Sequence, residues 1–148
     1  MNRTQENIAV GIDVGSRTIK LVAYDGQRMV HNKILDNAYN TMDIIKNLLD
    51  EVQYDVLMAT GYGRTLVEIE WDAPTVSEIT AFAMGCSQEL PGQKTILDMG
   101  GQDTKVIRVN DAGKVLKFEM NDRCAAGTGK FFEVMAKPLN YSLNDFNH

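Results

Sequence analysis

The chain has 148 residues, 44% of them hydrophobic, and a formal net charge of −5 at pH 7. This length allows one average domain, or one lobe and part of a second. The acidic balance argues against a general nucleic-acid binder, and no apolar run approaches the length of a membrane span. We therefore expect a cytoplasmic protein without nucleic-acid or membrane partners, whose two cysteines form no disulfide framework.

The first part of the chain predicts strands and helices arranged around an open sheet. Alternating apolar residues indicate three strands, at 8–14, 19–24 and 29–35. A helix is expected from Thr41, its predicted N-cap, to Val52, and a short buried strand at Asp55–Thr60. Gly61–Arg64 then reads as a flexible loop at the C-terminal end of that strand, where ligands bind in open α/β sheets.

The second part begins again after a break at Trp71–Pro74. A helix is expected over Val76–Glu89, with Thr75 and Glu78 at capping-box spacing. It ends at Pro91-Gly92, so we place a first lobe at 1–93 and a second lobe at 94–148. Three further strands are expected, at 95–99, 104–110 and 114–120. A loop at 121–126 then leads into a last helix over Gly127–Ala136, with Pro138 beyond it.

One pattern occurs twice, in Gly11–Val22 and in Ile96–Ile107. Each copy has an apolar strand that ends in an aspartate, then a tight glycine turn, then a second apolar strand. Three pairs of residues align at a constant spacing of 85 positions: Asp13 with Asp98, Gly15 with Gly100, and Lys20 with Lys105. We interpret this as an internal repeat, in which two related lobes each offer one acidic glycine hairpin to a shared cleft.

The chemistry of the repeated hairpin suits a nucleoside triphosphate. Glycine, serine and threonine expose N–H and hydroxyl donors that can hold phosphate oxygens. A carboxylate at the mouth of each hairpin can hold hydrated Mg²⁺, which prefers oxygen ligands and keeps several waters. A single copy would be only a hairpin turn, but two copies in register favour the nucleotide site.

Residues 121–131 form a second informative stretch, which is rich in small residues and leads into a helix. N–H groups at such a helix start can hold an anion. The stretch is not a P-loop, because Cys124 stands at the required first glycine and Phe131 replaces the Ser/Thr after the lysine. The helix start and Arg123 favour a Cys124 thiolate, a ligand for zinc or iron–sulfur, although an inert loop residue fits as well. Cys86 fits the apolar stripe of its helix and is expected in the core.

These stretches resemble a known family, the activators of 2-hydroxyacyl-CoA dehydratases. The activators belong with the benzoyl-CoA reductase ATPase subunits, in the BadF/BadG/BcrA/BcrD type of the wider actin/hexokinase/Hsp70 (ribonuclease H-like) ATPase fold. The resemblance runs from about Ile8 to Leu139 and implies an α/β fold with one complete lobe and the start of a second. It rests on four motifs, at 11–16, 59–64, 98–103 and 121–131.

The resemblance implies an ATPase coupled to electron transfer. In such a family, a homodimer shares one [4Fe–4S] cluster, and each subunit binds ATP and Mg²⁺ and passes a low-potential electron to a CoA-ester dehydratase or reductase. It implies catalytic roles for Asp13, Asp98 and Gln102, with Mg²⁺ held through water by the two aspartates. Cys124 matches a cluster ligand, beside which Gly127 and Gly129 shape the loop. The implied nucleotide contacts are Gly15, Ser16, Arg17, Thr18, Lys20, Gly100, Gly101 and Asp103.

The resemblance also implies parts that have no counterpart in this sequence, namely a second cluster cysteine and the glycine-rich loop that grips adenosine. We therefore expect a truncated or split activator that would need a separate C-terminal half. Two alternatives are a non-catalytic module that binds such a partner and a small-molecule kinase of the same fold, against which the Cys124 motif argues. Arg64 is expected either to contact nucleotide or partner or to be solvated.

Overall fold

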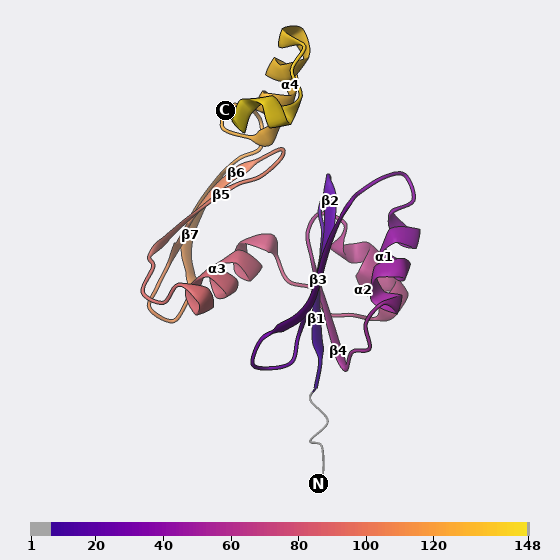
Figure 1. Cartoon of the computed structure of the whole chain (residues 1–148). Helices are drawn as coiled ribbons and strands as arrows, with labels where there is room; N and C mark the ends of the chain where they lie inside the picture. Colours follow the sequence, from indigo (N-terminus) through magenta and orange to yellow (C-terminus); the bar gives the residue numbers. More distant parts are fainter. Residues whose placement is uncertain (1–6, 148) are drawn as a thin grey trace. The chain divides into compact units, whose positions relative to one another are not determined.

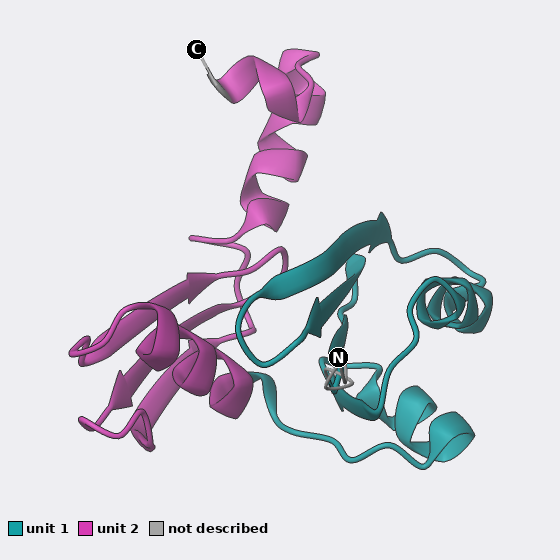
Figure 2. Cartoon of the chain, turned by 60° about the horizontal axis from the view of Figure 1, so that its bottom comes forward, with its two compact units in different colours: residues 1–78 teal, residues 79–148 magenta. Residues whose placement is uncertain are grey.

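The computed structural model of the chain describes residues 7–147 and divides into two compact units, residues 1–78 and 79–148 (Figure 2). The first unit is built on a four-stranded sheet with the order β3-β2-β1-β4. Its strands are β1 (Ala9–Val14), β2 (Thr18–Tyr24), β3 (Met29–Asp36) and β4 (Val56–Thr60). β1 pairs antiparallel with β2 and parallel with β4, so the expected hairpin and the later buried strand share one sheet.

Two helices, α1 (Thr41–Asp50) and α2 (Arg64–Trp71), lie on the same side of this sheet (Figure 1). Side chains alternate between the two faces of a strand, so every second residue of β1 and β2 points toward the helices. Those residues are fully buried with Ile45 and Leu48 of α1 and Val67 of α2. The sheet members of this core are Val10, Ile12, Val14, Ile19, Leu21 and Ala23.

The segment after α2 extends the sheet instead of starting a helix. Thr75 forms a parallel bridge with Ala59, and the Val76 N–H donates to the Ala59 carbonyl at 2.9 Å. The expected capping box at Thr75 and Glu78 is therefore wrong, because the backbone at Thr75 is engaged with the sheet. The helix α3 (Glu78–Glu89) begins later than expected.

The second unit has a three-stranded antiparallel sheet with the order β5-β6-β7. Its strands are β5 (Thr95–Met99), β6 (Thr104–Val109) and β7 (Val115–Asn121). α3 belongs to this unit and packs Ala83 against the buried side chains of Ile107 and Val109. The helix α4 (Gly129–Leu139) and the short 3₁₀ helix η1 (Leu143–Asn147) follow and extend beyond the tip of the β5–β6 hairpin (Figure 1).

Two helix ends differ from the sequence expectation. The N-cap of α1 is Asn40, not Thr41, since the Thr41 hydroxyl donates to Asn37 Oδ1 at 2.6 Å instead of capping the helix. Pro138 lies inside α4, where its missing N–H affects only the last turn, and Asn140 then ends the helix in a left-handed conformation with φ of 55°. Among the described residues, no helix is both long and apolar enough to cross a membrane.

Leu21→Ala should strongly destabilise the first unit. Leu21 is completely buried in its core, so the truncation leaves a cavity, and we expect the free energy of unfolding to fall by about 2–5 kcal/mol. The single tryptophan, Trp71, packs against the same core and reports this unfolding by fluorescence during urea denaturation. Ile34→Ala is the matched control, because Ile34 is 64% exposed on the edge strand and its truncation should cost under about 0.5 kcal/mol.

Candidate functional site

The first hairpin sets an aspartate opposite a lysine. The antiparallel register of β1 and β2 pairs Asp13 with Lys20, and Lys20 Nζ donates to Asp13 Oδ2 at 2.7 Å. The lysine side chain remains 45% exposed, so solvent reaches the ion pair. Such an exposed pair contributes at most about 1 kcal/mol to stability and can exchange partners at little cost.

Backbone hydrogen bonds fix the turn of this hairpin. The Gly15 N–H donates to the Thr18 carbonyl at 3.0 Å, and this leaves Ser16 and Arg17 exposed at the tip. Asn37, which follows β3, donates its side-chain amide to the Gly15 carbonyl at 2.7 Å and its backbone N–H to the Arg17 carbonyl at 2.8 Å. The turn is therefore fixed by a hydrogen bond within the hairpin and by two hydrogen bonds from Asn37, without a ligand.

The Gly61–Arg64 segment packs tightly against the same hairpin. The Gly63 N–H donates to the Val14 carbonyl at 2.8 Å, and Arg64 Nη1 donates to the Gly61 carbonyl at 3.1 Å. A Cβ at Gly61 would lie 2.4 Å from Asp13 Oδ1, and its φ of +91° favours glycine. The segment expected as a loop therefore packs closely against Asp13 and Val14. Arg64 binds its own loop.

A cavity of about 320 Å³ lies between the tip of the first hairpin and the start of α2. Its polar lining comes from Ser16, Asn37, Thr41 and Thr65, and the exposed ring of Tyr62 lies at its side. Hydroxyls and amides of this kind can hydrogen-bond a polar ligand.

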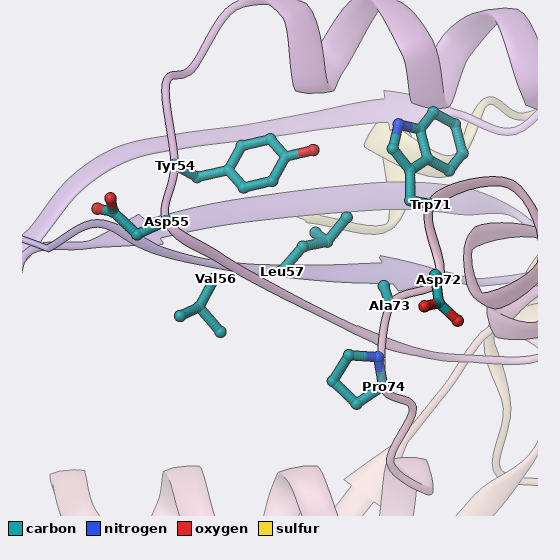
Figure 3. A pocket seen from close by; sticks show the side chains of 8 residues that line it. All are labelled: Tyr54, Asp55, Val56, Leu57, Trp71, Asp72, Ala73 and Pro74. Atoms are coloured by element: carbon teal, nitrogen blue, oxygen red, sulfur yellow. The ribbon is translucent and has the colours of Figure 1, made fainter.

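A second cavity, of about 300 Å³, lies at the other end of the sheet and is lined by Tyr54, Trp71 and Pro74 among others (Figure 3). It borders the first residues of β4, whereas Asp13 pairs with Thr60 at the last residue of β4. Ligands of open α/β sheets bind at the carboxyl ends of the strands. The hairpin end, and not this cavity, is therefore the candidate functional site of the first unit.

The second hairpin repeats the geometry with a stronger charge cluster. β5 and β6 pair Asp98 with Lys105, and the Gly100 N–H donates to the Asp103 carbonyl at 2.8 Å. Lys105 Nζ lies 2.6 Å from Asp103 Oδ1 and 3.3 Å from Asp98 Oδ2. The Lys105 side chain is only 5% exposed, so two carboxylates share a buried ammonium group. This cluster keeps one negative charge, whereas the pair in the first hairpin is neutral.

The start of α4 is bonded to the turn of the second hairpin. The Gly129 N–H donates to the Gly100 carbonyl at 3.0 Å, and the Lys130 N–H donates to the Gly101 carbonyl at 2.8 Å. A Cβ at Gly129 would lie 3.3 Å from Gly101 Cα, so glycine permits this close approach. These two N–H groups are satisfied by the hairpin. We expected the N–H groups at this helix start to hold an anion. That expectation is wrong for the Gly129 and Lys130 N–H groups, because both already donate to the hairpin.

Cys124 is exposed in the loop that precedes α4. The Asn121 side chain holds this loop, since it donates to the Cys124 carbonyl at 3.1 Å and accepts the Cys124 N–H at 3.3 Å. The Ala126 N–H donates to Cys124 Sγ at 3.4 Å, so the sulfur is oriented within the loop. Cys86 is half-buried on α3. Within residues 7–147, no cluster of three or more His, Cys, Asp or Glu side chains is arranged to hold a metal ion.

The structure groups the predicted site residues by unit. The first hairpin carries Asp13, Gly15, Ser16, Arg17, Thr18 and Lys20. The second hairpin and the loop bonded to it carry Asp98, Gly100, Gly101, Gln102, Asp103, Cys124, Gly127 and Gly129. Sequence reasoning did not assign a role to Asn37 or to Lys105. The repeat could have indicated Lys105, which aligns with Lys20, but Asn37 carries no motif.

Comparison with solved structures places this geometry in the actin/hexokinase-like class of ATPases. The chain superimposes on component A of the Acidaminococcus fermentans (R)-2-hydroxyglutaryl-CoA dehydratase with a TM-score of 0.82 at 37% identity, covering 94% of this chain and 56% of that one. It superimposes on the Clostridium difficile activator of 2-hydroxyisocaproyl-CoA dehydratase, solved with bound ADPNP, with a TM-score of 0.79 at 33% identity, covering 92% and 53%. The ethanolamine utilization protein EutJ from Carboxydothermus hydrogenoformans shares the fold at 16% identity.

Residues 10–147 match the BadF/BadG/BcrA/BcrD ATPase family, and the chain belongs to that family. It is 40% identical to the activator of lactoyl-CoA dehydratase from Anaerotignum propionicum, over 92% of this chain and 55% of that protein. The family resemblance and the fold inferred from the sequence are thus confirmed. The chain spans about half the length of the curated relatives that it matches.

Gly61→Ala should destabilise the first unit by at least about 2 kcal/mol, because the new Cβ meets Asp13 and Val14 and φ is unfavourable. Urea denaturation followed by Trp71 fluorescence measures this loss. Gly11→Ala is the control, since a Cβ there meets nothing within 4 Å. Equal stability of the two variants would show that the close packing of Gly61 against Asp13 and Val14 does not contribute to stability.

Proposed function

We propose that this chain binds MgATP through its two hairpins and belongs to an activator that delivers a low-potential electron to a CoA-ester dehydratase or reductase. The observation that carries the proposal is the repeated hairpin, in which an aspartate closes one strand and pairs with a lysine across a glycine turn. Relatives over most of the chain are named activators of lactoyl-CoA and 2-hydroxyisocaproyl-CoA dehydratases.

The two hairpins suit different parts of nucleotide binding. Lys20 is exposed and holds one carboxylate, so its ammonium group can turn to a phosphate oxygen and release Asp13. Lys105 is buried between two carboxylates and fixes Asp98 in place. Both aspartates offer oxygen ligands of the kind that hydrated Mg²⁺ takes. We assign Gln102, exposed at the second turn, to orienting the attacking water during hydrolysis.

The residues of this chain do not complete an iron–sulfur site. A [4Fe–4S] cluster takes four thiolates, whereas Cys124 is the one cysteine in the loop that the family motif identifies. Two copies of the chain would bring two such thiolates, and the others would have to come from polypeptide outside residues 7–147. We therefore propose a homodimer in which Cys124 supplies part of a shared cluster.

A small-molecule kinase of the same fold is not favoured, since the relatives that match most of the chain are activators and a reductase subunit. The other alternative is a non-catalytic module that binds a separate C-terminal half. Exposed apolar side chains in the second unit support it. Leu97 and Met99 of its sheet are more than half exposed, although both are apolar. Such exposure is typical of a surface that another polypeptide covers.

Asp98→Asn should weaken the binding of MgATP by at least about tenfold, since it removes a charged oxygen ligand and unbalances the Lys105 cluster. Isothermal titration calorimetry with the non-hydrolysable analogue ADPNP measures binding without turnover. Lys33→Ala is the control. Lys33 lies on the edge strand β3 of the first unit and forms an ion pair with Glu51, so this variant also removes one charged partner but leaves both hairpins unchanged. Equal affinity of wild type and Asp98→Asn would argue against the role of the second hairpin.

Anaerobic reconstitution of the chain, mixed with the part of a full-length relative that does not align with it, should load iron and acid-labile sulfide in a manner that depends on Cys124. We expect the Cys124→Ala variant to lose the bound iron and the visible absorption, because the exposed thiolate is removed. Cys86→Ala should retain both, since Cys86 is half-buried on α3. Equal iron content in wild type and Cys124→Ala would contradict the proposed cluster ligand.

A further inference from the structure

Hydrogen bonds of Asn37 connect the turn of the first hairpin to the start of α1. The side-chain amide of Asn37 donates to the Gly15 carbonyl at 2.7 Å, and its backbone N–H donates to the Arg17 carbonyl at 2.8 Å. Its Oδ1 accepts the hydroxyl of Thr41, the first residue of α1, at 2.6 Å. A carbonyl can only accept, so the amide nitrogen must face Gly15 and the amide oxygen must face Thr41. The hydroxyl of Thr41 therefore holds the amide in the orientation that binds the turn.

These hydrogen bonds also set the direction of two peptide groups in the turn. The C=O and the N–H of one trans peptide point in opposite directions. The carbonyls of Gly15 and Arg17 both face Asn37. The N–H groups of the same two peptides belong to Ser16 and Thr18, and they therefore point away from Asn37. Backbone N–H groups at a turn can hold phosphate oxygens, so Asn37 fixes the direction of two such donors.

The second hairpin has an equivalent support at the aligned glycine. Gly100 stands 85 positions after Gly15 in the repeat, and its carbonyl accepts the Gly129 N–H at 3.0 Å. In both hairpins, a donor from outside the hairpin thus binds the carbonyl of the same glycine. The donor is a backbone N–H of α4 in the second unit and the side chain of Asn37 in the first. The feature that the two units share is the bound carbonyl, and not the element that binds it.

A cavity borders the first turn on the side of Asn37. Asn37 and Thr41 line this cavity of about 320 Å³ together with Ser16 and Thr65. Truncation of Asn37 would enlarge the cavity, and the Gly15 carbonyl would lose the amide as its donor. We expect the turn then to sample several conformations, and only some of these direct the N–H groups of the turn toward one ligand.

We propose that Asn37 is a positioning residue of the phosphate site, which holds the first turn in its binding conformation through the carbonyls of Gly15 and Arg17. Thr41 acts through Asn37, because its hydroxyl orients the amide. Neither side chain has to touch the nucleotide. The inference rests on the proposed binding of MgATP and names the support that this binding requires in the first unit. A turn that is ordered in the ligand-free chain avoids the entropic cost of ordering it on binding.

Asn37→Ala should weaken the binding of MgADPNP at least about tenfold, because the ligand must then order the turn. Thr41→Val removes only the orienting hydroxyl and should weaken binding about three- to tenfold. Thr41→Ser keeps the hydroxyl and should restore the affinity of the wild type. Isothermal titration calorimetry measures all of these affinities. Asn32→Ala is the matched control, since Asn32 is an exposed asparagine of β3, and it should bind like the wild type.

A purely structural role of Asn37 would lower the thermal stability of the chain without changing its affinity for nucleotide. The backbone amide signals of Ser16 and Thr18 in NMR spectra of the ligand-free chain report the turn directly. Asn37→Ala and Thr41→Val should shift or broaden both signals, whereas Thr41→Ser should leave them as in the wild type.

The outcomes separate this inference from the proposed function. Wild-type affinity of Asn37→Ala, or unchanged Ser16 and Thr18 signals in that variant, would overturn the positioning role and leave the binding of MgATP intact. Failure of Thr41→Ser to restore the affinity would show that Thr41 does not act through its hydroxyl, and would overturn the role given to the Asn37 amide. A wild-type chain that does not bind MgADPNP would overturn both the proposed function and the positioning role.

Discussion

Both candidate sites depend on the antiparallel register of their hairpins. In each hairpin this register sets an aspartate, two residues before the glycine of the turn, opposite a lysine on the next strand. The register places Asp13 against Lys20 and Asp98 against Lys105. A slip of one residue would turn every side chain of the strand to the other face. It would then separate both ion pairs and also expose the buried side of β1. The packing of the first unit thus enforces the geometry of its charged hairpin.

The two copies of the hairpin have diverged in the environment of the lysine. In the first copy, position 18 is threonine and the lysine has one carboxylate partner, in contact with solvent. In the second copy, the aligned position is Asp103, and the lysine is buried and contacts two carboxylates. Removing one partner from a buried ion pair costs about 3–5 kcal/mol, far more than at an exposed one. Lys105 is therefore a fixed part of the scaffold, whereas Lys20 is free to serve a ligand.

The sequence predicted the strands well, because alternation of apolar residues is a local signal. β5 was predicted with its observed bounds, and the other strands differ by one residue at one end, or at both ends for β7. The helix α2 was missed, since it is only 8 residues long, lacks a side-chain cap and buries a single residue, Val67. The repeat aligned Asp13 with Asp98, Gly15 with Gly100 and Lys20 with Lys105, and the family resemblance implied the other site residues of each hairpin. Asn37 could not be predicted, because its role comes from the return of β3 to the hairpin tip.

The cysteine loop shows why motif chemistry needs the fold around it. From the sequence, the glycines before α4 suggested an anion site at the helix start. In the structure, the first N–H groups of α4 bond to the carbonyls of Gly100 and Gly101. The Thr104 hydroxyl donates to the Gly127 carbonyl at 2.7 Å and adds a third link. A change in the second turn must therefore shift the start of α4 and the Cys124 loop. Nucleotide chemistry at this hairpin and metal chemistry at the loop would share one backbone connection.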